Sequence, residues 1–267
     1  MSVWARPVDH RGRGIDFGKT AADYDRHRPD FPPSMYDRLT RLGWIKPAMR
    51  VLDLGTGTGA LALGLAARGL DVIGLDPSLE LLDVARRRAA EAHLDATFIA
   101  GTAEHTEREA ASFDLVTAGQ CWWWFEAGAA LGEVERVLKP AGRLLIANFC
   151  YLPTPGSVAA RTEELILEHN PGWPKAGESG IFESQVRDLD GRAFRAVESF
   201  SYVESVAFTP EAWRGRVRAC NGVGAALEPA AVDAFDRALA ARLDLEFPGE
   251  LVIPHRVFVV TGLRREE

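Results

Sequence analysis

The sequence predicts an α/β fold in which helices flank a doubly wound, mostly parallel sheet. Residues 51–54 (VLDL) form a short apolar run typical of a buried strand, and the glycine-rich segment 55–59 (GTGTG) follows it. Apolar residues then recur at helical spacing as far as Gly69, and residues 71–76 form a second apolar strand. Strand, glycine turn, helix and strand in this order are typical of a parallel βαβ unit.

The glycine turn and the acidic residue after the second strand predict a nucleoside pocket. A turn with few side chains lets the backbone come close to a ligand. Asp76 stands 21 residues after Gly55, where a carboxylate can accept hydrogen bonds from both hydroxyls of a ribose.

Asp53, two residues before the first glycine, indicates which nucleoside is bound. In a dinucleotide site the glycine amides and the helix N-terminus receive a pyrophosphate, which a carboxylate at Asp53 would repel. S-adenosylmethionine carries a sulfonium and an ammonium beside a single carboxylate, so Asp53 favours that ligand. Gly55, Gly57 and Ala60 would also satisfy a nicotinamide fingerprint, so a nicotinamide-dependent oxidoreductase stays an alternative that conflicts with Asp53.

The pattern Asp-x-Gly-x-Gly-x-Gly at 53–59 resembles motif I of the class I S-adenosylmethionine-dependent methyltransferases. Three further segments match the family in the right order. The end of strand three and the adenine loop correspond to residues 99–104, and strand four corresponds to residues 112–120. The Leu-Lys-Pro-x-Gly turn and strand five correspond to residues 134–146. The resemblance implies a seven-stranded sheet with a helical cap, S-adenosylmethionine as cofactor, and methyl transfer by in-line displacement. A non-catalytic S-adenosylmethionine-binding protein stays an alternative, because a fold alone does not show turnover.

The resemblance also implies a set of cofactor-binding residues. Family members usually have Asp at the place of Thr102, and Thr offers the adenine amino group only a hydroxyl, so this contact should rely on the backbone of Ala103. Tyr24 and Arg28 lie four residues apart on one helical face, where Arg28 could grip the methionine carboxylate and Tyr24 could cover the sulfonium. The alternative is that Tyr24 packs in the core and Arg28 is solvated. The full predicted set is Tyr24, Arg28, Asp53, Gly55, Thr56, Gly57, Asp76, Pro77, Thr102, Ala103 and Gln120.

Length and composition predict one domain. The chain has 267 residues, of which 47% are hydrophobic, enough for one large core. We expect a single methyltransferase domain over 1–267, with an N-terminal lid (1–46), a cofactor-binding half (47–150), a cap with strand six (151–247) and a final strand (248–267). Two helices are predicted in the cap, one that begins at Thr209-Pro210 and one with apolar spacing over 229–247. Residues 252–263 predict the last strand, which the family places between strands five and six.

Charge and cysteines limit the class of partner. A net charge of −7 disfavours nucleic acids as substrates, so a small-molecule acceptor is expected. Three cysteines in no metal-ligand spacing predict free thiols in a reducing compartment and no metal site. The sequence lacks an 18-residue apolar run and a signal-peptide pattern, so we expect a cytoplasmic protein without membrane association. It predicts no oligomeric state.

Four residues outside the nucleotide motifs are candidates for the acceptor site. Relatives resembling trans-aconitate methyltransferases commonly have a histidine where Trp123 stands, and a tryptophan can stack on an acceptor but cannot take a proton. Arg214 and Arg216 border the apolar stripe of their helix and indicate an anionic acceptor, unless they are solvated. A carboxylate or thiolate acceptor would need no base; for other acceptors His169 and His255 are weak candidates, since both positions also suit structural histidines.

Overall fold

The structure is a computed structural model that describes residues 21–190 and 194–265, without the side chains of residues 21, 22 and 24. Residues 1–20 of the predicted lid (1–46) and the side chain of Tyr24 therefore lie outside the described part. In the part of the chain that is described, no helix is long and apolar enough to span a membrane.

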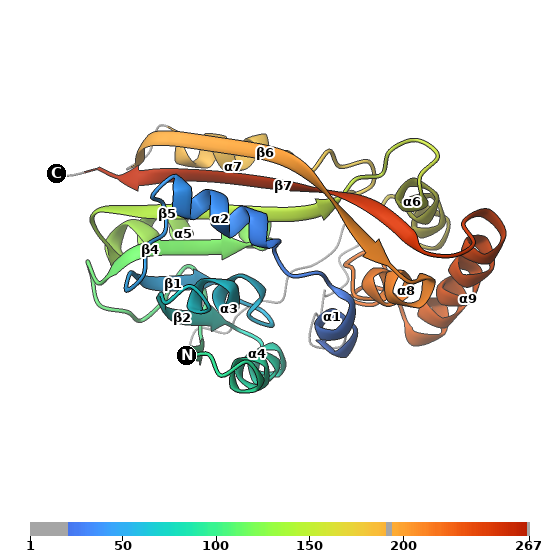
Figure 1. The fold of residues 1–267 in the computed structure, drawn as a ribbon, viewed down its shortest axis with the longest axis horizontal. Helices are drawn as coiled ribbons and strands as arrows, with labels where there is room; N and C mark the ends of the chain where they lie inside the picture. Colours follow the sequence, from blue (N-terminus) through green and yellow to red (C-terminus); the bar gives the residue numbers. More distant parts are fainter. Residues whose placement is uncertain (1–20, 191–193, 266–267) are drawn as a thin grey trace. The chain divides into compact units, whose positions relative to one another are not determined.

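Seven strands form one sheet in the order β3-β2-β1-β4-β5-β7-β6. All pairings between neighbours from β3 to β5 are parallel, whereas the arrow of β7 in Figure 1 points opposite to those of β5 and β6. The predicted mostly parallel α/β sheet is confirmed, including the last strand between strands five and six. The strands are β1 (Arg50–Leu54), β2 (Asp71–Asp76), β3 (Ala96–Ala100), β4 (Phe113–Gly119), β5 (Leu138–Tyr151), β6 (Phe194–Phe208) and β7 (Leu251–Arg264).

The described chain divides into two compact units, which we call the sheet unit and the helical unit. The sheet unit contains Asp30–Phe149, Phe182–Tyr202 and the chain from Val257 onward; the helical unit contains the described residues up to Pro29, Cys150–Ile181 and Val203–Arg256. Strands β5, β6 and β7 each pass from one unit into the other. This division by contacts differs from the functional segments predicted above, whose boundaries stay predictions.

The sheet unit carries helices on both faces of its strands. In Figure 1, α2 and α3 lie in front of the sheet, and α5 and α7 lie behind it. Buried apolar side chains of β1, β4, β5 and α5 form its core. Its helices are α2 (Pro33–Arg41), α3 (Ala60–Ala66), α4 (Leu79–Glu91), α5 (Ala127–Val137) and α7 (Glu183–Leu189), with a 3₁₀ turn, η2 (Trp122–Trp124), before α5.

The predicted βαβ unit is confirmed almost residue for residue. Strand β2 has the predicted bounds, β1 begins one residue early, and α3 starts directly after the glycine turn. Gly69 has a φ of 78°, the left-handed conformation expected of a residue that ends a helix.

The predicted Leu-Lys-Pro-x-Gly turn is part of β5. Leu138 pairs with Phe113 and Arg143 pairs with Leu115, so the four residues 139–142 bulge out between two paired positions. A Cβ at Gly142 would lie 2.9 Å from the carbonyl oxygen of Lys139, so this tight bulge requires glycine.

The helical unit is built from α1 (Ala21–His27), α6 (Val158–His169), α8 (Pro210–Arg218) and α9 (Pro229–Glu246). Thr209 caps α8 as predicted, since its Oγ1 accepts a hydrogen bond of 3.1 Å from the amide of Ala212. Trp213 and Val217 of α8 are buried with α6 and α9 residues in one apolar cluster. Cys220 lies beyond the end of α8 and is half-buried.

Candidate active site

Three glycines of the turn after β1 adopt left-handed backbone conformations, with φ of 59° at Gly55, 55° at Gly57 and 81° at Gly59. A Cβ at Gly55 would lie 2.9 Å from both Cβ and Sγ of Cys121, so this glycine is required by packing. A Cβ at Gly57 would meet no atom of the described residues within 4 Å. The backbone at Gly57 therefore borders open space, as a ligand-binding loop requires.

Asp76 ends β2 beside this loop and is buried, with 7% of its surface exposed. Its Oδ2 accepts the amide of Gly57 at 2.9 Å and its Oδ1 accepts the amide of Ser78 at 2.9 Å. These bonds fix the orientation of the carboxylate. Each carboxylate oxygen can accept a second hydrogen bond, so Asp76 can still receive the two ribose hydroxyls that the sequence predicts for it.

Asp53 lies on β1 and is almost completely buried, with 1% of its surface exposed. Its Oδ1 accepts a hydrogen bond of 2.6 Å from Oγ1 of Thr117, its register partner on β4. Burial raises the pKa of Asp53 from 3.8 to about 6, an effect that the bond from Thr117 opposes and the nearby charge of Asp76 reinforces. Burial also raises the pKa of Asp76 to about 6, against the two backbone hydrogen bonds. Two buried carboxylates beside one glycine turn favour a ligand that carries positive charge.

The other residues predicted to hold the cofactor lie after the carboxyl ends of β1, β2 and β3. Thr56 is buried, and its amide donates to the carbonyl of Leu75 at 3.0 Å. Half-buried Pro77 follows Asp76, and half-buried Thr102 and buried Ala103 follow β3. Because the carboxyl ends of parallel strands meet at one edge, these residues share the edge of the glycine turn. Their contacts with an adenine ring stay a prediction.

Gln120 directly follows β4 with a φ of 56°, a conformation uncommon for a residue with a side chain. Its amide donates to the carbonyl of Ala147 at 2.9 Å, and its side-chain Nε2 donates to the carbonyl of Phe149 at 2.5 Å. The left-handed turn and these two bonds fix the start of the aromatic run 122–125. Such strained positions cluster at functional sites, which supports the predicted role of Gln120.

The aromatic run has both core and half-buried members. Trp122 is buried and its indole donates to Asp188 at 2.9 Å, while Trp124 and Phe125 are half-buried against the main core. Trp123 is half-buried and stacks on Phe182, with ring centroids 5.3 Å apart. Its predicted contact with the acceptor stays a prediction.

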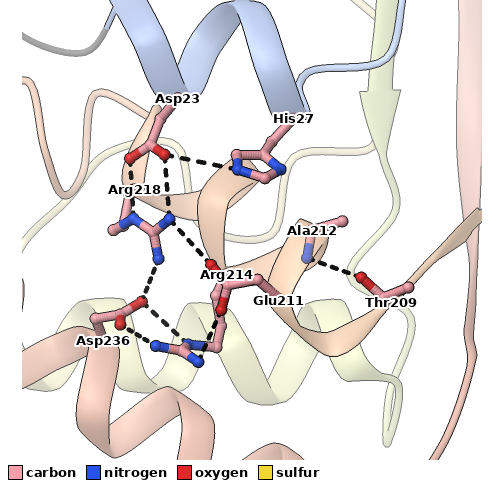
Figure 2. A network of polar contacts seen from close by, with 8 residues as sticks. All are labelled: Asp23, His27, Thr209, Glu211, Ala212, Arg214, Arg218 and Asp236. Atoms are coloured by element: carbon pink, nitrogen blue, oxygen red, sulfur yellow. Dashed lines mark hydrogen bonds and ion pairs between the residues drawn. The ribbon is translucent and has the colours of Figure 1, made fainter.

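Arg214 belongs to a network of ion pairs on the surface of the helical unit (Figure 2). It pairs with Asp236 of α9 and, at 3.0 Å, with Glu211 of its own helix. Arg218, one turn further, binds Asp236 at 2.7 Å and Asp23 of α1 at 2.9 Å. These two arginines link α8 to α9 and α1, so Arg214 has a structural role besides its predicted contact with the acceptor.

Arg216, two residues further along α8 than Arg214, is buried, with 6% of its surface exposed. Its guanidinium carbon lies 5.6 Å from the ring centroid of Tyr151. Arg28, which follows α1, is half-buried in the same unit, and both arginines lower the pKa of Cys150, whose thiol burial keeps neutral with a pKa of about 11.

The two candidate bases are both packed as structural histidines. His255 is fully buried, its Nδ1 lies 2.9 Å from the carbonyl oxygen of Ile253, and burial lowers its pKa to about 4. His169 packs edge-on against Phe235, with centroids 5.6 Å apart. The lowered pKa of His255 does not suit a general base near neutral pH.

Comparison with known proteins identifies the domain that contains the glycine turn. Residues 51–142, which hold the glycine turn, Asp53 and Asp76, match the family described as a methyltransferase domain. This part of the chain is a class I S-adenosylmethionine-dependent methyltransferase domain. The matched segment contains most of the predicted cofactor residues; Tyr24 and Arg28 fall outside it.

Several relatives of the methyltransferase domain are named methyltransferases. The chain is 41% identical over 136 residues to an uncharacterized methyltransferase of Mycobacterium tuberculosis, covering 50% of this chain and 52% of the relative. It is 39% identical over 115 residues to demethylmenaquinone methyltransferase of Thermus thermophilus, covering 42% of this chain and 52% of the relative. The chain thus spans about half the length of the curated relatives it matches. The finer resemblance to trans-aconitate methyltransferases stays a prediction.

Solved structures share the fold of this chain at low sequence identity. The YcgJ protein of Bacillus subtilis has a TM-score of 0.56 and 21% identity, over 86% of this chain and 98% of that one. Phosphoethanolamine N-methyltransferase 2 of Haemonchus contortus has a TM-score of 0.55 and 21% identity, over 93% of this chain and 57% of that one. That structure was solved with phosphomonomethylethanolamine and S-adenosylhomocysteine.

Sequence reasoning missed the residues that hold the predicted site residues in place by hydrogen bonds or ring contacts. Thr117 bonds to Asp53, Ser78 bonds to Asp76, and Tyr151 lies beside Arg216. Ser78 could have been found from sequence, because it is a helix cap two residues after a carboxylate. Thr117 and Tyr151 carry no local signal, since their partners lie more than 60 positions away in the sequence.

Proposed function

We propose that this protein transfers the methyl group of S-adenosylmethionine to a small-molecule acceptor by in-line displacement. The observation that carries the proposal is the pair of buried carboxylates, Asp53 and Asp76, beside a glycine loop that borders open space at Gly57. Asp76 would hold the ribose and Asp53 would face the positive charge of the methionine end. The cofactor supplies a methyl group on a good leaving group; the protein supplies alignment, which can contribute roughly 7 to 11 kcal/mol.

Two further observations support a small acceptor. The net charge of −7 disfavours a polyanion. The demethylmenaquinone and phosphoethanolamine enzymes similar to this chain are named for small-molecule acceptors. The cytoplasmic location stays a prediction, and the three free thiols agree with a reducing compartment.

In this proposal the acceptor does not depend on a general base of the protein to become nucleophilic. Burial lowers the pKa of His255 to about 4, so its ring is a weak proton acceptor, and His169 packs edge-on against Phe235. We therefore favour an acceptor whose nucleophile is already ionised near neutral pH, such as a carboxylate or an activated thiolate.

Calorimetry tests the cofactor assignment. We expect S-adenosylhomocysteine to bind and NADH not to bind, because Asp53 repels a pyrophosphate. Asp76→Ala should weaken S-adenosylhomocysteine about 10- to 100-fold, since hydrogen bonds to a charged acceptor contribute roughly 1.5 to 3 kcal/mol. Asp71→Ala is the matched control, because Asp71 begins the same strand and is exposed. Binding of NADH alone, or unchanged affinity in Asp76→Ala, would overturn the assignment.

Turnover tests the catalytic part. Transfer of tritium from methyl-labelled S-adenosylmethionine to pools of small carboxylic acids, thiols, phenols and amines should label at least one pool. Tight binding of the cofactor with no labelled pool would identify a non-catalytic binder instead.

A further inference from the structure

The sheet unit contains two buried amide side chains that the cofactor motifs do not include. Asn148 of β5 is fully buried, and Gln185 of α7 is 2% exposed. Nδ2 of Asn148 donates a hydrogen bond of 2.8 Å to Oε1 of Gln185. We call these two residues the amide pair. Both belong to the sheet unit, so the pair lies within one compact part of the chain.

One hydrogen bond does not satisfy the amide pair. Oδ1 of Asn148, an acceptor, and Nε2 of Gln185, a donor, are both buried, and neither has a hydrogen-bond partner among the described residues. Leaving a buried polar atom unpaired is costly, and most such atoms in folded proteins have a partner. If both amides turn by 180°, Gln185 donates to Asn148 instead, and one donor and one acceptor again remain. The pair therefore offers one donor and one acceptor to a third group.

The amide pair lies at the edge of the sheet that carries the predicted cofactor residues. Asn148 directly follows Ala147, which pairs with Gly119 at the carboxyl end of β4. The two carbonyls that flank Asn148 along β5 accept hydrogen bonds of 2.9 and 2.5 Å from Gln120, a predicted site residue. In open α/β sheets, ligands bind outside the carboxyl ends of the strands, so this position suits a ligand contact.

Helix α7, which carries Gln185, is anchored to the aromatic run after β4. The indole of Trp122 donates to Asp188 of α7 at 2.9 Å. Trp123, the predicted contact of the acceptor, stacks on Phe182 directly before α7, with ring centroids 5.3 Å apart. The amide of Gln185 donates to the carbonyl of Phe182 at 3.1 Å. The amide pair and the predicted acceptor contact are thus linked through one short segment of the chain.

The unpaired atoms of the amide pair select one kind of chemical group. A carboxylate or a phosphate dianion only accepts hydrogen bonds, so it would meet Oδ1 of Asn148 as a second acceptor. An ammonium only donates, so it would meet Nε2 of Gln185 as a second donor. A hydroxyl or an amide group both donates and accepts, so it can satisfy both atoms of the pair.

We propose that the amide pair binds an uncharged hydroxyl or amide group of the methyl acceptor, which donates to Asn148 and accepts from Gln185. The inference rests on the proposed function, because it names a group that the acceptor carries. This group is separate from the ionised nucleophile that receives the methyl group. Asn148 and Gln185 are specificity-determining residues in this arrangement, since a site built to hydrogen-bond a group rejects analogues that lack it.

Thermal denaturation with S-adenosylhomocysteine present tests the proposal with two pairs of matched probes. Phenol and benzamide donate and accept hydrogen bonds, whereas their counterparts anisole and acetophenone only accept. Probes with a ring are used because flat rings pack well on aromatic side chains such as Trp123. In wild-type protein the half-saturating concentration of the donating probe should be about 10- to 100-fold lower than that of its counterpart in at least one pair. The pair that responds distinguishes a hydroxyl from an amide.

The combined variant Asn148→Leu with Gln185→Met removes the amide pair. It should fold, because replacing both partners of a buried hydrogen bond by apolar groups of similar shape is nearly neutral for stability. The preference for the donating probe should be lost, while S-adenosylhomocysteine affinity stays that of wild-type protein. Asn148→Leu alone decides the case if the combined variant does not fold, and the preference should fall there too because Oδ1 is absent.

Asp188→Leu is the matched control on the same helix. It removes the hydrogen bond between α7 and Trp122 but leaves the amide pair intact, so the preference between probes should stay that of wild-type protein. A purely structural effect of the pair would weaken both members of a probe pair equally and leave their ratio unchanged.

Three outcomes would overturn the proposal. They are no preference within either probe pair in wild-type protein, an unchanged preference in the variants of the amide pair, or an equal loss of preference in Asp188→Leu. The last result would show that the amide pair acts only by anchoring α7. Failure of the proposed function is separate, because it appears as absent cofactor binding or absent methyl transfer in the wild-type protein.

Discussion

The hydroxyl of Thr117 donates a 2.6 Å hydrogen bond to the carboxylate of Asp53 across two neighbouring parallel strands. It offsets only part of the cost of burying this charge, since the pKa of Asp53 remains raised to about 6. The free protein therefore keeps a carboxylate in a site that disfavours its charge, and a cationic ligand relieves that situation.

Asp53→Asn should stabilise the free protein while weakening S-adenosylmethionine. A pKa raised from 3.8 to about 6 means that ionised Asp53 destabilises the native state at pH 7, on the order of 1 to 3 kcal/mol. The asparagine oxygen can still accept from Thr117, so the fold is retained. Thermal unfolding without ligand should show a raised midpoint, and calorimetry should show weaker binding of S-adenosylmethionine.

Thr117→Val is the counterpart of this variant, because it removes the donor and leaves the carboxylate. It should lower the midpoint, since the buried charge loses its bond. A lowered midpoint in Asp53→Asn would show that the ionised carboxylate stabilises the free protein and contradict the argument from burial.

Cofactor affinity should fall in acid. In the free protein, burial raises the pKa values of Asp53 and Asp76 to about 6, and both must be ionised to meet a cation and two hydroxyl donors. Below that pH each protonation weakens S-adenosylmethionine by up to about tenfold per pH unit. Calorimetry between about pH 5 and 8 should show this fall, with a shallower slope in Asp53→Asn.

Acid should have the opposite effect on the stability of the free protein, which rises where cofactor affinity falls. Both folded pKa values lie above the unfolded value of 3.8, so the native state retains protons that the unfolded chain loses. The contribution of these two groups to stability is present below about pH 4 and is lost as pH rises through about 6. An affinity that is constant from pH 8 to pH 5 in wild-type protein would show that neither carboxylate titrates in this range.

Local signals explain how much of the fold the sequence predicted. The βαβ unit and α9, which begins at the predicted Pro229, have glycine, proline or apolar periodicity within a few residues. Helices α2, α4 and α7 were not predicted. Helices α2 and α7 have no side-chain hydrogen bond at the N-cap, whereas α4 is capped by Ser78, a signal that the prediction overlooked. Helix α7 has only seven residues, too short to show a clear period.

Some residues of the candidate site also have a local sequence signal, whereas others do not. Asp53, Gly57 and Asp76 could be named because their spacing along the chain is itself the signal. Arg214 and Arg216 could not be told apart, because the sequence shows only that both border an apolar stripe. Their surroundings differ, with Asp236 beside Arg214 and Tyr151 beside Arg216, and both neighbours come from other segments of the chain.

Gly57→Ala should reduce cofactor binding with little effect on folding. The new Cβ would enter space that the described residues leave open within 4 Å, and the left-handed φ of 55° adds strain of roughly 1 kcal/mol. Calorimetry should show weakened S-adenosylhomocysteine, while circular dichroism stays that of wild-type protein.

Gly55→Ala is the matched comparison on the same loop. Its Cβ would lie 2.9 Å from Cys121, so we expect lower stability as well as weaker binding. Equal cofactor affinity in Gly57→Ala and wild-type protein would place the ligand away from this part of the loop.

Arg218→Met should loosen α1 from the rest of the helical unit. Arg218 binds Asp23 of α1 at 2.9 Å and Asp236 of α9 at 2.7 Å, with 19% of its side chain exposed (Figure 2). Methionine keeps much of the aliphatic stem but removes both ion pairs, and the two acidic side chains then lose a shared partner. Hydrogen exchange of the amides in residues 21–28 should become faster, while amides of β1 and β4 in the sheet unit exchange as before. Arg242→Met is the control, because Arg242 pairs with Glu168 and Glu246 and, among the described residues, has no ion pair with α1. If α1 exchanges at the wild-type rate in Arg218→Met, its position depends on apolar packing with α8 rather than on the ion pairs, and Arg28 at its end would be held by that packing.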